Sequence, residues 1–403
     1  MQVPDLLARR ADLDGDRVAL VDTGSGARRT YGEVDERASR CAAFLRDEWG
    51  IRAGDRVALL AQNTIDMFEL LFGCARLGAL LVPLNWRLAT EELAAIVDDC
   101  RPSGLVFSAD FDAQATALSD RIPGATRALV GTTLADSATP LRMERDEDQP
   151  WYLLYTSGTT GRPKGVVYTP RMALVNHINI GTAIDLTSAD TTLNLLPQFH
   201  TGGINLYTMP TLYAGGTAIV QRAFDPDETL RLLADGVTAV FGVPTVYQEL
   251  ARHPRFADAD LSGVRVWASG GAPAPVSLVH TYAARGITLR QGMGMTETGP
   301  TVFLLDSEHA VEKAGSVGKP QVMVEVKAVD GEGRDVPPGE PGELLIRGPG
   351  VTPGYWERPD ATEAAFTPDG WLRSGDVGRC DEDGDWYIID RVKDVYISGG
   401  ENV

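Results

Sequence analysis

The segment WYLLYTSGTTGRPKG, residues 151–165, joins an apolar run to a loop rich in glycine and hydroxyl residues. The run WYLLY is typical of a buried strand. Glycines let the backbone approach an oxyanion closely, and Lys164 adds a positive charge. The loop is not a Walker A motif, because no glycine precedes Lys164 and Gly165 occupies the position that needs serine or threonine. It therefore predicts a phosphate-binding loop rather than a flexible linker.

Strand and helix patterns alternate on both sides of this loop. Apolar runs predict strands at residues 56–63, 79–85, 103–109, 217–221, 238–244 and 264–271. Helical periodicity predicts helices at residues 31–49, 67–77, 90–98 and 275–285. Such alternation is typical of parallel sheets covered by helices. The glycine-punctuated β runs at 322–330, 342–348 and 385–390 predict an antiparallel module.

The predicted fold class is α/β, with two α/β lobes whose mainly parallel sheets form a layered sandwich, plus a smaller antiparallel, β-barrel-like subdomain. We expect the first lobe at residues 1–170, ending in the phosphate-binding loop. The second lobe, with an acyl pocket and an adenine loop, is expected at 171–320. The β subdomain follows at 321–390, and a hinge at 391–403.

Four further motifs follow the loop: GMGMTETGP (292–300), GELLIRGPGVTPGYW (342–356), GWLRSGD (370–376) and DRVKDVYISGGEN (390–402). Together with YTSGTTGRPKG, they resemble in order the motifs of the adenylate-forming superfamily, which includes acyl-CoA synthetases, firefly luciferase and peptide-synthetase adenylation domains. The resemblance covers nearly the whole chain and is greatest to a CoA ligase for a fatty or other hydrophobic acid. It implies that ATP converts a carboxylate to acyl-AMP, and that CoA then displaces AMP.

The resemblance also implies a nucleotide site. A carboxylate beside a hydroxyl suits Mg²⁺ bridging triphosphate oxygens, so Glu297 is expected to hold Mg²⁺ and Thr296 to contact phosphate. Without the phosphate-binding loop, a helix cap would be the better interpretation of this pair. Asp376 offers two acceptors for ribose hydroxyls, with Arg391 as the second ribose contact, although a turn aspartate fits the spacing alone. The implied ATP/AMP-binding residues are Thr156, Ser157, Gly158, Thr159, Thr160, Gly161, Lys164, Gly270, Gly271, Ala272, Pro273, Gln291, Gly292, Met293, Gly294, Met295, Thr296, Asp376, Ile388 and Arg391.

Two positions depart from the family pattern. Met293 stands where relatives usually carry an aromatic residue that stacks on adenine, and a thioether covers a ring face less specifically. Tyr168 stands where relatives often carry histidine.

The segment LLPQFHTGGINLYTMP, residues 195–210, is expected to contact the acyl group. It has no acidic residue where amino-acid-activating relatives place an aspartate, and an unpaired buried ammonium is costly, so an amino acid substrate is disfavoured. His200 is implied at the acyl entrance, with a structural histidine as the alternative. The catalytic residues are expected to be Lys164, Thr296, Glu297 and His200. The acyl pocket is expected to contain Phe199, His200, Gly203, Ile204, Phe241, Val243 and Gly271, each of which alone is more typical of a core.

Composition excludes several other classes. Among 403 residues, 37 Lys and Arg face 56 Asp and Glu, giving a net charge of −19, which disfavours nucleic-acid binding. The four cysteines are too far apart to predict a zinc site or a disulfide framework, which fits a reducing cytoplasm. No signal peptide is evident, and the apolar stretch 69–84 is too short for a membrane span. The expected partners are a small carboxylic acid and CoA, and family members are often homodimers.

The end of the chain raises two alternatives. In the family, a mobile C-terminal α+β domain follows the hinge and supplies a lysine to the reaction. Lys393 matches the hinge, so we expect that domain to be absent from this chain and the catalysis to be impaired. A half-reaction enzyme that only thioesterifies a preformed acyl-adenylate therefore stays open, with Met293 in its favour. A non-catalytic nucleotide- or acyl-binding domain also stays open, although the complete motif set argues against it.

Overall fold

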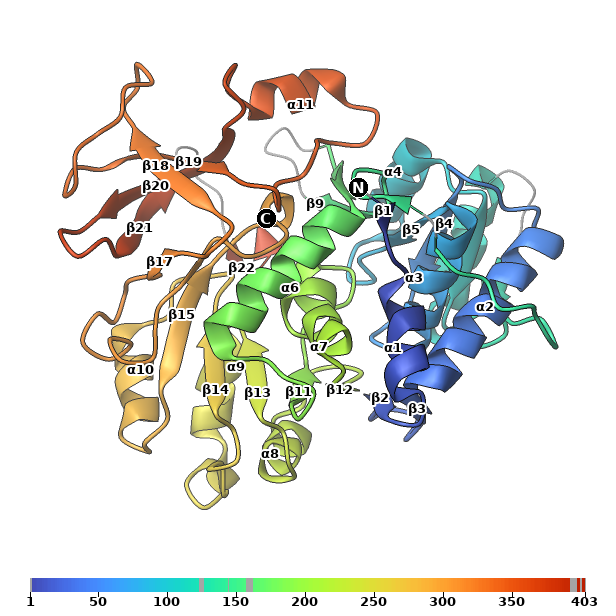
Figure 1. The fold of residues 1–403 in the computed structure, drawn as a ribbon, viewed down its shortest axis with the longest axis horizontal. Coiled ribbons are helices and arrows are strands. Elements are labelled where there is room, and N and C mark those ends of the chain that lie inside the picture. The colour runs from blue at the N-terminus through green and yellow to red at the C-terminus, as the bar shows by residue number, and fades with distance from the viewer. Residues whose placement is uncertain are drawn as a thin grey trace.

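The computed structural model describes residues 2–122, 127–143, 145–156, 162–391, 397–398 and 401–402. It contains two large sheets, a smaller antiparallel sheet, and the helices that cover them (Figure 1). The predicted α/β fold class is confirmed. Within these ranges, no helix is both long and apolar enough to cross a membrane.

The first large sheet has six strands. Its strands pair in parallel except for β10, which runs antiparallel to β9. Most of them are continuous apolar runs, as expected where helices cover both faces. In order across the sheet they are β10 (Lys164–Tyr168), β9 (Tyr152–Thr156), β5 (Leu80–Pro83), β4 (Arg56–Leu60), β6 (Gly104–Phe107) and β7 (Arg127–Leu129).

The second large sheet has nine strands and is parallel from β15 through β2. Its strands are, in order, β17 (Lys319–Pro320), β16 (Phe303–Leu304), β15 (Leu289–Met293), β14 (Val266–Ser269), β13 (Ala239–Gly242), β11 (Thr191–Asn194), β12 (Thr217–Val220), β2 (Val18–Asp22) and β3 (Arg28–Thr30).

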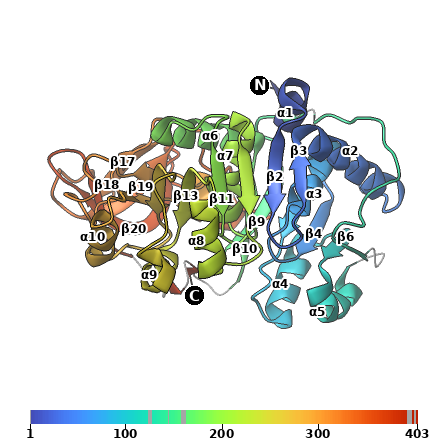
Figure 2. The same ribbon diagram turned by 90° about the horizontal axis from the view of Figure 1, so that it is seen from below.

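Strands β2 and β3 come from the beginning of the chain, yet they extend the sheet of the second lobe. Figure 2 shows these blue strands against the green and yellow part of the chain. The second sheet therefore crosses the predicted boundary at residue 170. The division into three parts stays a prediction, with this exception at the N-terminus.

Helices pack between the two sheets and on their outer faces. One continuous core contains side chains from both sheets together with side chains of α1, α2, α3, α6 and α7, which makes the arrangement a layered sandwich. Helices α4 and α5 pack on the other face of the first sheet, and α8, α9 and α10 on that of the second. The helices are α1 (Leu6–Asp14), α2 (Tyr31–Asp47), α3 (Asp66–Leu77), α4 (Thr90–Cys100), α5 (Asp112–Leu118), α6 (Pro170–Ile184), α7 (Thr208–Ala214), α8 (Pro226–Ala234), α9 (Pro244–Arg252), α10 (Val276–Ala283) and α11 (Pro359–Ala365).

The C-terminal part contains the predicted antiparallel module, but its described strands form an open four-stranded sheet and not the expected barrel-like arrangement. Its strands β18 (Glu325–Val329), β19 (Gly342–Arg347), β20 (Leu372–Cys380) and β21 (Trp386–Arg391) pair in sequence order. In Figure 1 this sheet lies above strands β13–β15 of the second large sheet. Two short pairs complete the described strands: β1 (Gln2–Val3) with β8 (Arg145–Asp146), and β22 (Ile397–Ser398) with β23 (Glu401–Asn402).

Local sequence signals explain where several elements begin. Helix α2 starts with a capping box: the Thr30 hydroxyl accepts from the Glu33 amide, and the Glu33 carboxylate accepts from the Thr30 amide. Helix α3 ends at Gly78, whose φ of 75° is the left-handed conformation that glycine adopts without strain.

Candidate active site

A cavity of about 570 Å³ opens at the carboxyl ends of the parallel strands of the second sheet. Side chains at the ends of β13, β14 and β15 meet there with residues of β10, α6 and the C-terminal antiparallel sheet. This edge is where open α/β sheets usually bind ligands. The cavity size is typical of a small-molecule site.

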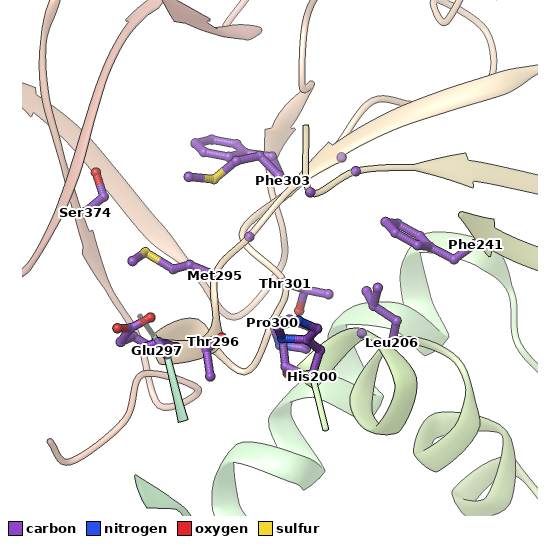
Figure 3. Close-up of a pocket in the computed structure, with 18 of the residues that line it drawn as sticks. His200, Leu206, Phe241, Met295, Thr296, Glu297, Pro300, Thr301, Phe303 and Ser374 are labelled. Carbon is purple, nitrogen blue, oxygen red and sulfur yellow. The ribbon is translucent and has the colours of Figure 1, made fainter. Parts of the chain in front are cut away.

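The charged end of this cavity lies opposite a group of aliphatic and aromatic residues. In Figure 3, Glu297, Thr296 and Met295 lie on one side, and Leu206 and Phe241 on the other. His200 and Thr301 lie between them. The predicted residues that line the cavity are Thr156, Lys164, His200, Phe241, Val243, Gly270, Gly271, Gly292, Met293, Gly294, Met295, Thr296, Glu297 and Arg391.

Glu297 lies in a single 3-10 turn, Thr296–Thr298, and its residue is only 8% exposed. The hydroxyl of Tyr355 donates to Glu297 Oε1 at 2.9 Å. Burial raises the pKa of the Glu297 carboxyl above its usual value, while the Tyr355 hydrogen bond and the charge of Lys164 oppose that rise. The Lys164 ammonium lies 5.1 Å from the centre of the Tyr355 ring. Tyr355 therefore lies between two charged residues of the site, Lys164 and Glu297, a role that no sequence motif indicated.

The loop before Glu297 requires glycine. A Cβ at Gly294 would lie 1.4 Å from the carbonyl oxygen of Pro300, so no other residue fits there without moving the backbone. This close approach brings the end of β15 against Pro300, which follows the turn that carries Thr296 and Glu297.

The surroundings of Glu297 fit a Mg²⁺ ion held largely by a nucleotide. Among the described residues, no group of three or more His, Cys, Asp or Glu side chains could hold a metal. Magnesium in nucleotide sites is commonly bound by one or two carboxylates together with substrate phosphates and water. Glu297 can supply one such carboxylate. A bound Mg²⁺ would neutralise charge on the phosphate oxygens.

The two predicted ribose contacts pair with each other. Asp376 and Arg391 are cross-strand partners on β20 and β21, and Arg391 Nε lies 2.9 Å from Asp376 Oδ1. Burial raises the pKa of the Asp376 carboxyl, and Arg391 opposes that rise. Arg391 lines the cavity together with Ser374 and Gly375, whereas Asp376 lies behind them. In this arrangement, Asp376 holds Arg391 at the cavity wall.

The predicted adenine segment is held by Gln291. Its side-chain oxygen accepts from the Ala274 amide at 3.0 Å, and its amide nitrogen donates to the Gly292 carbonyl at 2.9 Å. Gln291 is buried beneath the segment and does not line the cavity, so it supports the slot from behind. A Cβ at Gly270 would meet the Phe241 ring at 2.7 Å, which explains the glycine there. Three further predicted nucleotide residues also stay off the cavity wall, namely Ala272, Pro273 and Ile388.

Three predicted acyl-pocket residues belong to the core instead. Ile204 is fully buried and packs into the core between the two sheets. Phe199 packs edge-on against Trp86, with ring centres 6.2 Å apart. Gly203 sits against backbone, since a Cβ there would lie 2.2 Å from the Pro197 carbonyl oxygen. The segment forms a π-helical turn, Gly202–Leu206, whose geometry places Gly202 and Leu206 on the cavity wall in their place.

The apolar side of the cavity contains residues that the sequence did not indicate. Ile180 and Ile184 come from α6, four residues apart and therefore on one helix face. Tyr207 packs edge-on against Phe241 with ring centres 5.9 Å apart, and Leu304 of β16 completes this side. The helical spacing of the two isoleucines was visible in the sequence, but it does not distinguish a cavity wall from a core.

The predicted residues that lie outside the described ranges are Ser157, Gly158, Thr159, Thr160, Gly161 and Lys393. Their roles stay predictions.

Comparisons with known proteins agree with a nucleotide-binding site in this cavity. Residues 7–356 match the protein family described as AMP-binding enzyme. The chain is 42% identical over 400 residues to the feruloyl-CoA synthase of an Amycolatopsis species, and this match covers 98% of the chain and 79% of that protein.

Two solved structures have the same fold. The inhibitor-bound N-terminal domain of FACL13 from Mycobacterium tuberculosis has a TM-score of 0.90 and 33% identity, covering 96% of this chain and 98% of that chain. The o-succinylbenzoate coenzyme A synthetase (MenE) of Bacillus subtilis in complex with AMP has a TM-score of 0.89 and 30% identity. That match covers 100% of this chain and 81% of the other.

Proposed function

The chain belongs to the family of AMP-binding enzymes, and on this basis we propose that it is an ATP-dependent acyl-CoA synthetase for a compact hydrophobic acid, with an aromatic acid as the best candidate. Membership in this family confirms the resemblance to adenylate-forming enzymes and the assignment to the acid–thiol ligases. The identity of the acid and the roles of individual residues belong to the proposal.

One observation carries the proposal: a single cavity joins a charged side to an apolar side. Lys164, Glu297 and Arg391 belong to the charged side, and Ile180 and Phe241 belong to the apolar side. An acyl-adenylate has this same division, since it links an apolar acid to a nucleotide phosphate. The cavity therefore suits both the substrates and the intermediate of carboxylate adenylation.

The chain's own residues would promote the reaction by placement and charge. Lys164 and backbone N–H groups would stabilise negative charge that develops on phosphate oxygens as the carboxylate attacks. Glu297 would hold a Mg²⁺ ion at the triphosphate, and Arg391, held by Asp376, would position the nucleotide. Because the acid and ATP are held in one cavity, the reaction gains from proximity and needs no covalent nucleophile.

Cavity size and charge narrow the substrate. Ligand pockets commonly measure about 300–1,000 Å³, and this cavity of about 570 Å³ would hold both an adenylate and an acyl group, which favours a compact acid over a long chain. Among the residues that the structure describes, the apolar side presents Ile180, Ile184, Leu206 and Phe241 and no carboxylate for an ammonium group, which disfavours amino acids. The similarity to a feruloyl-CoA synthase also supports an aromatic acid.

The test is to incubate the protein with ATP, Mg²⁺ and CoA together with a panel of aryl acids and C6 to C16 fatty acids. Pyrophosphate and thioester are measured separately. Pyrophosphate release with a preference for aryl acids supports the proposal. Thioester formed only from supplied acyl-AMP would instead favour the half-reaction enzyme, and nucleotide binding without either product would favour a non-catalytic domain. Cytoplasmic location and a homodimer stay predictions.

A further inference from the structure

Tyr168 is the last residue of β10. Its ring is fully buried and stacks on the Tyr152 ring, with centres 4.7 Å apart and planes 15° from parallel. The stacking fixes the direction in which the hydroxyl points. It points toward two loops that line the cavity.

The hydroxyl of Tyr168 joins these loops through two short hydrogen bonds. It lies 2.7 Å from the carbonyl oxygen of Thr296 and 2.5 Å from the hydroxyl of Thr201. A carbonyl oxygen only accepts hydrogen bonds, so the Tyr168 hydroxyl donates its one hydrogen to the Thr296 carbonyl. Thr201 must therefore donate to Tyr168.

The chain of hydrogen bonds continues below Thr201 with a fixed direction. The Asn205 amide nitrogen lies 3.2 Å from the Thr201 hydroxyl and donates to it. The Asn205 amide nitrogen must face Thr201, because Thr201 has already donated its hydrogen to Tyr168. The side-chain oxygen of Asn205 then accepts from the Tyr152 hydroxyl at 2.7 Å. Every donor in the chain therefore points toward the Thr296 carbonyl. A chain of this kind is cooperative, and loss of one hydroxyl weakens its neighbours.

We propose that Tyr168 is a positioning residue that fixes the turn carrying Thr296 and Glu297 relative to the turn carrying His200 and Thr201. The first turn belongs to the charged side of the cavity, and the second lies between the charged and the apolar sides. Tyr168 thereby sets the placement of the acid relative to the phosphates. This inference rests on the proposed adenylation at the same site.

These hydrogen bonds also restrict the contacts that the Thr201 hydroxyl can make with a ligand. Its hydrogen is committed to Tyr168, and Asn205 occupies one of its lone pairs. Thr201 lines the cavity, so a ligand meets an acceptor there and no hydroxyl donor. A substrate carboxylate, which is itself an acceptor, is directed away from Thr201 and toward the Lys164 side.

The test compares Tyr168→Phe with Tyr31→Phe. Tyr31 is an equally buried phenol that donates to the backbone carbonyl of Gly216 at 2.7 Å, and Gly216, unlike the partners of Tyr168, does not line the cavity. Tyr168→Phe should lower kcat for pyrophosphate release by about 10- to 100-fold, because a small misplacement of reacting groups costs that much, and should change KM for ATP much less. Tyr31→Phe should leave kcat unchanged. Tyr168→His, whose ring N–H can also donate, should recover part of the lost kcat.

A second measurement does not depend on activity. Hydrogen exchange of backbone amides should become faster in both segments 199–206 and 293–300 in Tyr168→Phe, and in neither segment in Tyr31→Phe. Unchanged exchange in both segments overturns the inference, even if the protein has no adenylation activity. A Tyr168→Phe variant with wild-type kcat in an active enzyme also overturns it. Absence of pyrophosphate release from the wild type, together with faster exchange in Tyr168→Phe, overturns the proposed function and leaves the linkage standing.

Discussion

Removing the Tyr355 hydroxyl should shift the pH dependence of adenylation to higher pH. This hydroxyl donates to Glu297 Oε1 at 2.9 Å and stabilises the ionised carboxylate in a site where burial raises its pKa. The Tyr355→Phe substitution keeps the ring beside Lys164 and removes only the donor. The pKa of Glu297 must then rise further.

The size of the shift follows from the hydrogen bond. A hydrogen bond to a charged group contributes about 1.5–3 kcal/mol, and 1.36 kcal/mol corresponds to one pKa unit, so the pKa of Glu297 should rise by about one to two units. Adenylation as proposed needs the ionised carboxylate. Activity is therefore lost as pH falls through this pKa, and in the variant the loss begins at higher pH.

The assay is kcat/KM for pyrophosphate release between pH 4.5 and pH 9, because this parameter reports ionisations of the free enzyme. The acid limb should move upward by about one to two pH units in Tyr355→Phe and stay in place in Tyr31→Phe. An acid limb that stays in place, or moves downward, would refute the reasoning. Either result would mean that Glu297 does not control the limb or that the bond does not favour its charged form.

Three further predictions concern the charged side, the apolar side and the core. Burial raises the pKa of Glu297, so its ionisation lowers the stability of the fold as pH rises through that pKa. Glu297→Gln should therefore raise the thermal midpoint more at pH 8 than at pH 5, while it lowers pyrophosphate release. An equal change of the midpoint at both pH values would count against this cause. Phe241→Ala enlarges the apolar side next to Tyr207. The kcat/KM for C10 acids divided by that for aryl acids should rise by about tenfold. An unchanged ratio would place the acyl group elsewhere. Asp5 caps α1, and its carboxylate lies 3.0 Å from the buried guanidinium of Arg76. Asp5→Ala should lower the free energy of unfolding, measured in urea, by about 3 kcal/mol. Asp12→Ala, which removes an exposed ion pair with Arg142, should leave it nearly unchanged, and similar losses in both variants would contradict this difference.

The sequence predicted the elements of the fold well where the signal was local. The apolar runs at 56–63, 79–85 and 103–109 became β4, β5 and β6, and the pattern at 31–49 became α2 with its Thr30–Glu33 capping box. It gave no indication that residues 18–30 would extend the second sheet. That placement depends on pairing between β2 and β12, which are about 200 residues apart, and no local period reports such pairing.

In the candidate site too, the sequence indicated some residues correctly and others not. Residues in the motifs, such as Lys164, Glu297 and Arg391, line the cavity. The glycine-rich surroundings of Lys164 and Glu297 show in the sequence where the backbone turns. Phe199 and Ile204 were assigned to the cavity and lie in the core, while Ile180 and Ile184 were not assigned and line it. Apolar side chains look alike in a sequence whether they face a core or a ligand, and only packing separates the two.

By itself, the sequence determined the family, the α/β class and the chemical groups available for a nucleotide. The tertiary structure decided which of these groups meet. Tyr168, Thr201 and Thr296 come from distant segments, and one phenol hydroxyl brings them within hydrogen-bond distance. Tyr355 reaches Glu297 from 58 residues further along the chain. Such contacts depend on the distances and directions between packed elements. The spacing of residues along the chain does not predict them.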